Sequence, residues 1–248
     1  GIPYSYHAPK SYIETNIIGT YNILNASKIN NIQKTIITST SEVYGTAQKV
    51  PILETHPLNA QSPYAASKTG ADQLALSIHR SFKLPVSIIR PFNTFGPRQS
   101  TRAIIPTIIT QILNNNKIIK LGNLSPTRDF TYVEDTADSF VQALKSNKIN
   151  GETINIGNNF EISIKNIIEI MKNDFGYNFK VVLDKKRVRE KKSEVFRLIT
   201  SNDKAKKLIH WKPKYEGIKG FKLGLKKTIE WFKDPKNLKD YNSNSYKI

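Results

Sequence analysis

The segment KTIITSTSEVYG (residues 34–45) determines the fold class that we predict for this sequence. It begins with the β-branched run TIIT (35–38) and changes abruptly to three hydroxyl side chains and a carboxylate (39–42). A continuous β-branched run is typical of a strand that is covered on both faces. Open parallel α/β sheets place their ligands at the carboxyl ends of their strands. The segment therefore predicts a buried parallel strand with a ligand site at its tip.

Long helices alternate with short apolar strands around this segment. Residues 9–30 repeat apolar side chains at helical spacing, and residues 62–82 start like a helix, with Ser62 as N-cap and Pro63 at the first helical position. Residues 85–92 read as a second buried strand. The alternation of helices and strands predicts an α/β fold with a parallel sheet.

The pattern loosens into a mixed α+β region after a seam near residue 95. The helices expected there span residues 103–116, 133–146, 163–176, 201–211 and 217–233. The strands expected there span residues 117–122, 152–157 and 180–184.

The charge of the chain is strongly positive but dispersed. The 248 residues hold 38 Lys and Arg against 20 Asp and Glu, a formal net charge of +18. Basic residues cluster only at 185–192 and along 203–227, and the sequence shows neither a nucleic-acid-binding motif nor interleaved aromatic and basic residues. We therefore interpret the charge as surface lysine and predict no nucleic-acid partner.

Metal centres and membrane spans are not predicted. The chain has no Cys, which excludes disulfides and thiolate ligands and fits a cytoplasmic location. The four histidines show no metal-ligand spacing. No apolar run approaches the 18 residues that a transmembrane helix needs, so we predict no membrane association.

Tyr64 and Lys68 form a Y-x-x-x-K pair within the expected helix 62–82. Residues four apart lie on one helix face, with Cβ atoms about 5–6 Å apart. An ammonium beside a phenol favours the phenolate, although lowering a tyrosine pKa from about 10 to 7 takes ~4 kcal/mol from Lys68 and further positive charge. The pair is therefore a candidate general base for a hydroxyl group.

The same spacing occurs twice more, at Tyr6/Lys10 and Tyr215/Lys219. The first contains Pro9 and the second contains Gly217, so neither is expected inside an uninterrupted helix. Only Tyr64 follows a hydroxyl-rich strand end by a couple of dozen residues, which singles out this pair as the candidate site.

Six segments together resemble the extended short-chain dehydrogenase/reductase superfamily, and specifically its NAD-dependent nucleotide-sugar epimerases and dehydratases. They are YIETNIIGTYNILNAS (12–27), STSEVYG (39–45), SPYAASKTGAD (62–72), IIRPFNTFGPRQ (88–99), TRDFTYVEDTA (127–137) and NIGNNFEISI (155–164). The resemblance is most specific for 4,6-dehydratases of the legionaminic-acid type, which act on a nucleotide-linked N-acetylhexosamine. The nucleotide, UDP or GDP, stays open.

The resemblance implies a Rossmann-like doubly wound parallel sheet with a smaller mixed α+β substrate domain. We expect residues 1–95 to form a partial NAD-binding domain that carries the catalytic residues. Residues 96–233 are expected to be mainly substrate-binding, with some segments returning to the sheet, and residues 234–248 to form a polar tail.

The first strands of the family and its glycine-rich turn, T-G-x-x-G-x-x-G, do not occur in the sequence. Such a turn holds the cofactor pyrophosphate at a helix N-terminus. We expect that about 80 family residues precede the chain, an estimate that fits the need for a complete βαβ phosphate site. We also expect that the chain has no dehydratase activity by itself.

The resemblance assigns chemistry to the strand tip. A 4,6-dehydratase oxidises C4 of the sugar, eliminates water across C5–C6 and returns the hydride to C6. Tyr64, with Lys68 behind it, is expected to take the proton of the 4-hydroxyl, and Thr40 to hydrogen-bond the 4-oxygen. Glu42 is expected to remove the C5 proton.

Ser41 departs from the pattern of many dehydratases, which carry an Asp at this position as the acid that protonates the leaving 6-hydroxyl. GDP-mannose dehydratases also read Thr-Ser-Glu here, so Glu42 is expected to serve both steps, aided by Ser41 or a water. UDP-glucuronate decarboxylases share the same reading, and nucleotide-sugar 4-epimerases share the first step. Both remain alternative functions, as do a nucleic-acid-binding protein and a catalytically silent scaffold.

The remaining site residues also follow from the resemblance. Asn93, Arg98, Arg128 and Arg189 are expected to contact the substrate, the arginines through its diphosphate, because guanidinium groups suit phosphate oxygens. Asn16 and Ser39 are expected to bind NAD together with Tyr64 and Lys68.

Self-association is implied as well. The family forms homodimers through two long helices, which correspond to residues 9–30 and 62–82, in a four-helix contact.

Overall fold

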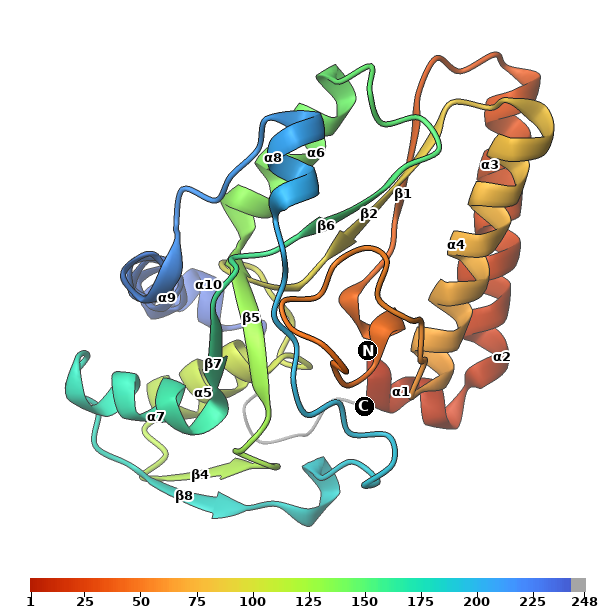
Figure 1. Ribbon diagram of the computed structural model, residues 1–248. Coiled ribbons are helices and arrows are strands. Elements are labelled where there is room, and N and C mark those ends of the chain that lie inside the picture. The colour runs from red at the N-terminus through yellow and green to blue at the C-terminus, as the bar shows by residue number, and fades with distance from the viewer. Residues whose placement is uncertain (242–248) are drawn as a thin grey trace.

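The computed structural model describes residues 1–241, and its centre is a parallel sheet with helices on both faces (Figure 1). Its strands, in spatial order, are β1 (Thr35–Thr38), β2 (Val86–Pro91) and β6 (Thr153–Ile156). Helices α3 (Gly19–Ile29) and α4 (Pro63–Phe82) cover one face, and α6 (Val133–Lys145) and α8 (Asp203–Ile209) cover the other. The predicted parallel α/β sheet is confirmed, and β6 is the segment of the second half that returns to it.

The helical stretch expected at residues 9–30 is confirmed as consecutive segments. They are α2 (Pro9–Tyr12), the π-helix η1 (Ile13–Ile18) and α3, preceded by α1 (Ile2–His7). Helix η1 packs against α4 at Gly70, where an added Cβ would lie 2.9 Å from Cδ1 of Ile17. The close approach of these two helices therefore depends on a residue without a side chain.

Helix α4 begins as its sequence predicts. The Ser62 hydroxyl accepts a hydrogen bond from the backbone N–H of Ala65 at 3.1 Å, and Pro63 occupies the first turn. The helix ends at Lys83, which adopts a left-handed conformation with φ of 56°. These caps determine where α4 begins and ends, and therefore which of its residues lie opposite the carboxyl end of β1.

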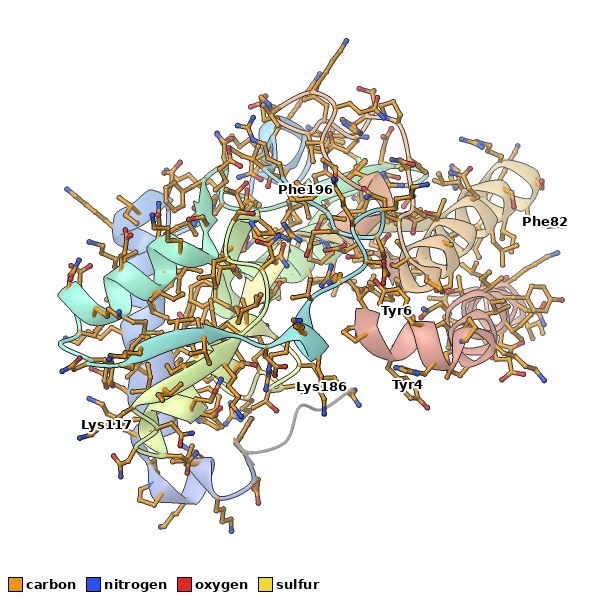
Figure 2. The ribbon with its side chains drawn as sticks, turned by 90° about the horizontal axis from the view of Figure 1, so that it is seen from below. Tyr4, Tyr6, Phe82, Lys117, Lys186 and Phe196 are labelled. Atoms are coloured by element: carbon orange, nitrogen blue, oxygen red, sulfur yellow. The ribbon has the colours of Figure 1, made fainter. Side chains whose placement is uncertain are left out.

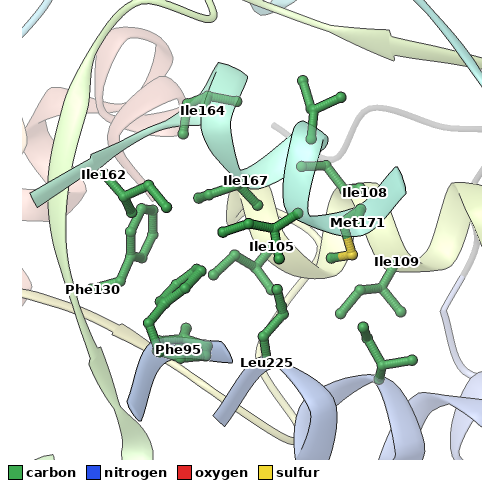
Figure 3. Packing of buried hydrophobic residues seen from close by; sticks show 14 of the residues in the cluster. Phe95, Ile105, Ile108, Ile109, Phe130, Ile162, Ile164, Ile167, Met171 and Leu225 are labelled. Carbon is green, nitrogen blue, oxygen red and sulfur yellow. The ribbon is translucent and has the colours of Figure 1, made fainter. Parts of the chain in front are cut away.

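The second half of the chain builds a separate hydrophobic core around a small mixed sheet (Figure 3). The strands of this half are β3 (Asn93–Phe95), β5 (Thr127–Tyr132) and β7 (Glu161–Ser163), together with the parallel pair β4 (Ile118–Leu121) and β8 (Lys180–Leu183). Its helices are α5 (Ile104–Leu113), α7 (Ile164–Asn173), α9 (Gly217–Lys233) and α10 (Pro235–Leu238). Phe95, Phe130 and Leu225 lie in this core, so β3, β5 and α9 pack as one unit.

A connecting segment (residues 194–201) joins the two halves by backbone hydrogen bonds. On one side its carbonyls at Arg197 and Ile199 accept from Ala47 at 3.1 Å and Ile52 at 2.8 Å. On the other side the Phe196 carbonyl accepts from Thr127 of β5 at 3.0 Å. These hydrogen bonds therefore fix the distance between the loop after β1 and the first residue of β5.

Several elements differ from the sequence prediction. The sequence predicts the first strand over residues 34–41, whereas β1 ends at Thr38, because Thr40 caps the short helix η2 (Ser41–Tyr44). Strands β3, β5 and β7 were not predicted, since they are short and β5 mixes charged with apolar residues. Within the expected polar tail, α10 and Tyr241 pack on the second core; residues 242–248 lie outside the described residues.

None of the helices within residues 1–241 combines the length and the apolar character that crossing a bilayer requires.

Candidate active site

A cavity of about 650 Å³ opens at the carboxyl ends of β1 and β2, where the two halves of the chain meet. Its wall brings together many of the predicted site residues. They are Ser39, Thr40, Glu42 and Tyr64 from the first half, and Asn93, Arg128 and Arg189 from the second. The volume is within the range of small-molecule sites.

Thr40 and Glu42 are positioned by helix η2. Thr40 is extended, with φ of −159°, and its hydroxyl accepts a hydrogen bond from the Glu42 backbone N–H at 3.3 Å. Both side chains are more than nine-tenths buried and still reach the cavity wall. The turn therefore presents an alcohol and a carboxylate side by side at the strand tip.

Tyr64 faces these two residues from the first turn of α4. Its phenol is hydrogen-bonded to the Thr40 side chain, and its ring makes an edge contact with Tyr12 at 6.0 Å between centroids. Burial raises the pKa of Tyr64, and the negative field of Glu42 adds to this rise while the Thr40 hydrogen bond opposes it. The expected lowering by Lys68 is thus not observed in the protein alone, where the phenol is kept neutral.

Lys68 lies one turn further along α4, behind Tyr64 as seen from the cavity. Its ammonium donates a hydrogen bond to the carbonyl of Thr38, the last residue of β1. Burial lowers the pKa of Lys68, and the carboxylate of Asp72 opposes this shift. The ammonium therefore links α4 to the strand that carries Thr40.

Asn16 supports α4 from η1. Its side-chain amide donates to the Ser67 hydroxyl at 2.9 Å, and that hydroxyl donates to the Tyr64 carbonyl at 2.8 Å. Asn16 is not part of the cavity wall formed by the described residues. Its observed contacts brace the first turn of α4.

Two arginines and a glutamate lie together in the cavity wall and form a positively charged region. Arg128 of β5 is 7% exposed, and one guanidinium nitrogen lies 3.5 Å from Oε1 of Glu194. Arg189 lies 3.8 Å from the same oxygen. Burial lowers the pKa of Arg128, while the charges of Glu42 and Glu194 raise it. The guanidinium groups of Arg128 and Arg189 are held by Glu194 in positions that suit the binding of a further anion.

Two side-chain oxygens in the cavity wall are buried without a hydrogen-bond partner among residues 1–241: Oδ1 of Asn93 and Oε1 of Gln99. Buried polar atoms are rarely left unpaired in proteins. Both are acceptors, so they suit a ligand that carries N–H or O–H donors.

Two further predicted site residues lie outside the cavity wall of the described residues, as Asn16 and Lys68 do. Arg98 has φ of 66°, its guanidinium stacks over Trp231 at 5.9 Å, and it is not part of the cavity wall of the described residues, so its contact with the substrate stays a prediction. Ser41 is 2% exposed inside η2 and does not belong to the cavity wall of the described chain. The backbone turn after β3 takes Arg98 away from the cavity and leads to Arg102, which does line it.

The sequence analysis missed Arg102, Gln99 and Glu194 as cavity residues. For Glu194 a signal was present, since it follows the basic run at 185–192 and precedes the apolar Val195. An acid that follows a basic run and precedes an apolar residue is a candidate counterion for that run.

Among residues 1–241, His, Asp and Glu side chains form no cluster of three or more that is suited to holding a metal ion.

Comparison with known proteins gives a consistent result. A family model described as GDP-mannose 4,6 dehydratase matches residues 1–223. A UDP-glucuronate 4-epimerase from Thermodesulfobacterium geofontis is 33% identical over 94% of this chain and 70% of its own length. A human dTDP-D-glucose 4,6-dehydratase is 32% identical over 88% of this chain and 62% of its own length.

A solved structure extends the likeness to three dimensions. The dTDP-glucose 4,6-dehydratase of Bacillus anthracis in complex with NAD is 30% identical, with a TM-score of 0.79. The match covers 90% of this chain and 69% of that protein.

Proposed function

Because the chain belongs to the GDP-mannose 4,6-dehydratase family of NAD-dependent nucleotide-sugar dehydratases and epimerases, we propose that it carries the catalytic groups for the 4,6-dehydration of a nucleoside-diphosphate sugar. The observation that supports this most directly is the convergence of Thr40, Glu42 and Tyr64 on one cavity. The reaction needs a base for a hydroxyl, a base for a C–H bond and a donor to the sugar oxygen. These three side chains supply those functions.

We propose that the substrate is a nucleotide-linked N-acetylhexosamine whose diphosphate binds Arg128 and Arg189. Both arginines are in the cavity wall and come from the second half of the chain, Arg128 from β5 and Arg189 from the segment after η3 (Lys185–Arg187). Bidentate guanidinium contacts suit phosphate oxygens. The choice of an N-acetylhexosamine rests on the sequence motifs that resemble the legionaminic-type dehydratases.

The residues present fit the nicotinamide–ribose end of NAD. Tyr64 is in the cavity wall, and the Lys68 ammonium has three N–H donors, of which one goes to the Thr38 carbonyl. The 248 residues contain no T-G-x-x-G-x-x-G turn, and we assign none of them to the pyrophosphate. Bound NAD supplies the hydride acceptor for C4 and the hydride donor for C6.

The proton transfers fall to the side chains of this chain. Oη of Tyr64, as phenolate, takes the 4-hydroxyl proton while the Thr40 hydroxyl donates to the 4-oxygen. The resulting 4-keto group acidifies C5, and a carboxylate oxygen of Glu42 takes the C5 proton. The same proton then leaves with the 6-hydroxyl as water. When C6 is reduced, C5 regains a solvent-derived proton through Glu42, and Tyr64 releases the 4-hydroxyl proton to solvent. Since burial raises the pKa of Tyr64, positive charge from Lys68 and from the bound cofactor has to offset that rise.

A 4-epimerase is the second candidate, because Ser41 is buried and no side chain at that position reaches the cavity wall of the described residues. Epimerisation needs the oxidation at C4 and the return of the hydride to the opposite face of C4, with the proton going back to the 4-oxygen, and it requires no acid at C6. The T. geofontis relative is an epimerase by name.

Proton exchange at C5 separates the two functions, because only the proposed dehydration removes this proton, and the exchange does not depend on hydride transfer. The chain is mixed in D₂O with a UDP-linked 4-keto-6-deoxy-N-acetylhexosamine, and deuterium at C5 is followed by NMR. We expect protein-dependent exchange at C5, because Glu42 removes that proton. Absence of C5 exchange from a ligand that binds, as measured by calorimetry, would contradict the dehydratase proposal and leave the epimerase.

We further propose that the protein forms a homodimer through the helices at residues 9–29 and 63–82. Their outer surface carries apolar side chains that are about half exposed, such as Ile13 (50%), Ile18 (50%) and Phe82 (56%). Figure 2 shows Phe82 and, on α1, Tyr4 and Tyr6 at the same side of the molecule. Contiguous exposed apolar surface of this kind marks interaction sites.

The double substitution Ile13→Lys/Ile18→Lys is expected to raise the dimer Kd by roughly a hundredfold or more, because each unpaired ammonium would be buried at the interface. Sedimentation velocity over a concentration series measures this. The matched control is Val141→Lys, on α6 at the other face of the sheet and 47% exposed. Equal dimerisation of the double variant and the control would rule out this interface.

A further inference from the structure

Asp72 of α4 is fully buried, and a single oxygen of its carboxylate makes all its hydrogen bonds. Oδ2 accepts from Nε of Arg90 at 2.9 Å and from the Ser39 hydroxyl at 2.8 Å, and it lies 2.9 Å from Nη2 of Arg90. Oδ1 is buried and has no hydrogen-bond partner within residues 1–241. An unpaired carboxylate oxygen in the protein interior is costly, so its retention calls for an explanation.

The position of Asp72 on α4 supplies the second observation. Tyr64, Lys68 and Asp72 follow one another at four-residue spacing and therefore share one helix face. The field of Asp72 acts on both neighbours: it raises the pKa of Lys68 and also that of Tyr64. The carboxylate is thus the counter-charge of the ammonium that stands behind the phenol.

The ion pair is part of a buried chain of hydrogen bonds beneath the cavity. The other arm of Arg90 donates to the Tyr44 hydroxyl at 2.8 Å, and that hydroxyl donates to Oδ1 of Asn155 at 2.7 Å. Ser39 follows β1, Arg90 is in β2, Asn155 is in β6, and Tyr44 closes the turn that carries Glu42. One network therefore joins the three strand ends to the catalytic face of α4.

We propose that Asp72 is a positioning residue that keeps the Lys68 ammonium charged and in place behind Tyr64, and that anchors this pair to the ends of β1 and β2. Removing the charge of Asp72 would leave the partly buried Lys68 ammonium with the Thr38 carbonyl and without the anion that opposes the effect of burial. The ammonium would then lose its proton more easily and would no longer favour the Tyr64 phenolate. The role of Lys68 rests on the proposed function, whereas its electrostatic coupling to Asp72 does not.

The other ionisable groups around this helix face come from three elements. Glu42 of η2 and Tyr12 of α2 act on Tyr64, and Arg90 of β2 is bound to Asp72. For Lys68 itself, Asp72 is the charged group that opposes the effect of burial. A change at position 72 is therefore expected to appear most clearly in the titration of Lys68.

The test is the ionisation of Lys68, followed by NMR in the 248-residue chain with lysine labelled at ¹³Cε and the signal assigned with Lys68→Met. In Asp72→Asn the midpoint of this titration is expected to fall by about one pH unit or more, because an opposite charge at close range is lost. The control Asp135→Asn removes another buried carboxylate, one that accepts backbone N–H groups of Lys214 and Tyr215. It is expected to leave the Lys68 midpoint unchanged.

An unchanged Lys68 midpoint in folded Asp72→Asn would overturn the proposal. If that variant does not fold because Arg90 is left unpaired, Asp72→Leu/Arg90→Met removes both charges, a change that buried ion pairs often tolerate. A smaller fall of the midpoint is expected in the double variant, because the positive charge of Arg90 is removed together with the carboxylate. A midpoint equal to or above that of the unmodified chain would overturn the proposal. Since the titration is read without turnover, it can fail or succeed independently of the dehydratase assay.

Discussion

Replacement of Glu42 by glutamine is expected to slow the exchange of the C5 proton of a 4-keto sugar by about 10²–10⁴-fold, the usual contribution of a positioned general base. Glutamine keeps the size of the side chain and its place in η2 but cannot accept a proton. The backbone N–H of residue 42 still donates to the Thr40 hydroxyl, so the turn is expected to stay intact. The measurement is deuterium incorporation at C5 by NMR under saturating ligand.

The matched control is Glu54→Gln. Glu54 is partly buried, and its carboxylate accepts the Asn155 backbone N–H at 2.8 Å, outside the cavity wall. Exchange at C5 is expected to continue at the unmodified rate in this variant. Comparable exchange rates in Glu42→Gln and Glu54→Gln would remove Glu42 from the proposed mechanism.

Asp129→Asn is expected to lower the free energy of unfolding by about 2–4 kcal/mol, because buried donors lose their acceptor. Asp129 is in β5 and is fully buried. Its Oδ1 accepts from the Asn158 backbone at 2.6 Å, and its Oδ2 accepts from the Thr200 hydroxyl at 2.6 Å and from the Thr200 backbone at 3.1 Å. An amide offers one acceptor oxygen in place of two and turns a donor toward one of these donors. Urea unfolding measures the loss.

The pH dependence of this loss has a definite sign. Burial raises the pKa of Asp129 from 3.8 to about 6, so the folded state holds this proton more tightly than the unfolded state does. The group therefore adds stability at low pH and loses about 3 kcal/mol of it as the pH rises from about 4 to about 6. The stability gap between the original protein and Asp129→Asn should accordingly widen as the pH falls through this window. A constant gap would show that Asp129 does not titrate there.

The tip of β1 was predictable because several independent patterns agree on it. The β-branched run, the hydroxyl-rich turn and the Ser62–Pro63 helix start each specify local structure, and parallel pairing of β1 with β2 brings their carboxyl ends together. Local rules therefore sufficed to bring Thr40 and Tyr64 into contact.

Features that depend on tertiary packing were not predictable in the same way. Arg98 and Arg102 are equally basic in the sequence, and only the left-handed residue at 98 decides which of them reaches the cavity. The ion pair of Asp72 and Arg90 was also not predictable. An aspartate in a helix is normally expected to face solvent, and only the position of Arg90 in the strand beneath α4 shows that Asp72 is buried. The roles of these residues follow from their burial in the folded chain and not from their spacing in the sequence.

The connecting segment (residues 194–201) has a consequence for how ligands enter. Main-chain hydrogen bonds on both sides connect it to the loop after β1 and to the start of β5. Movement of the loop after β1 away from the start of β5 would break these main-chain hydrogen bonds. The spacing between the loop after β1 and the start of β5 is therefore constrained before any ligand arrives.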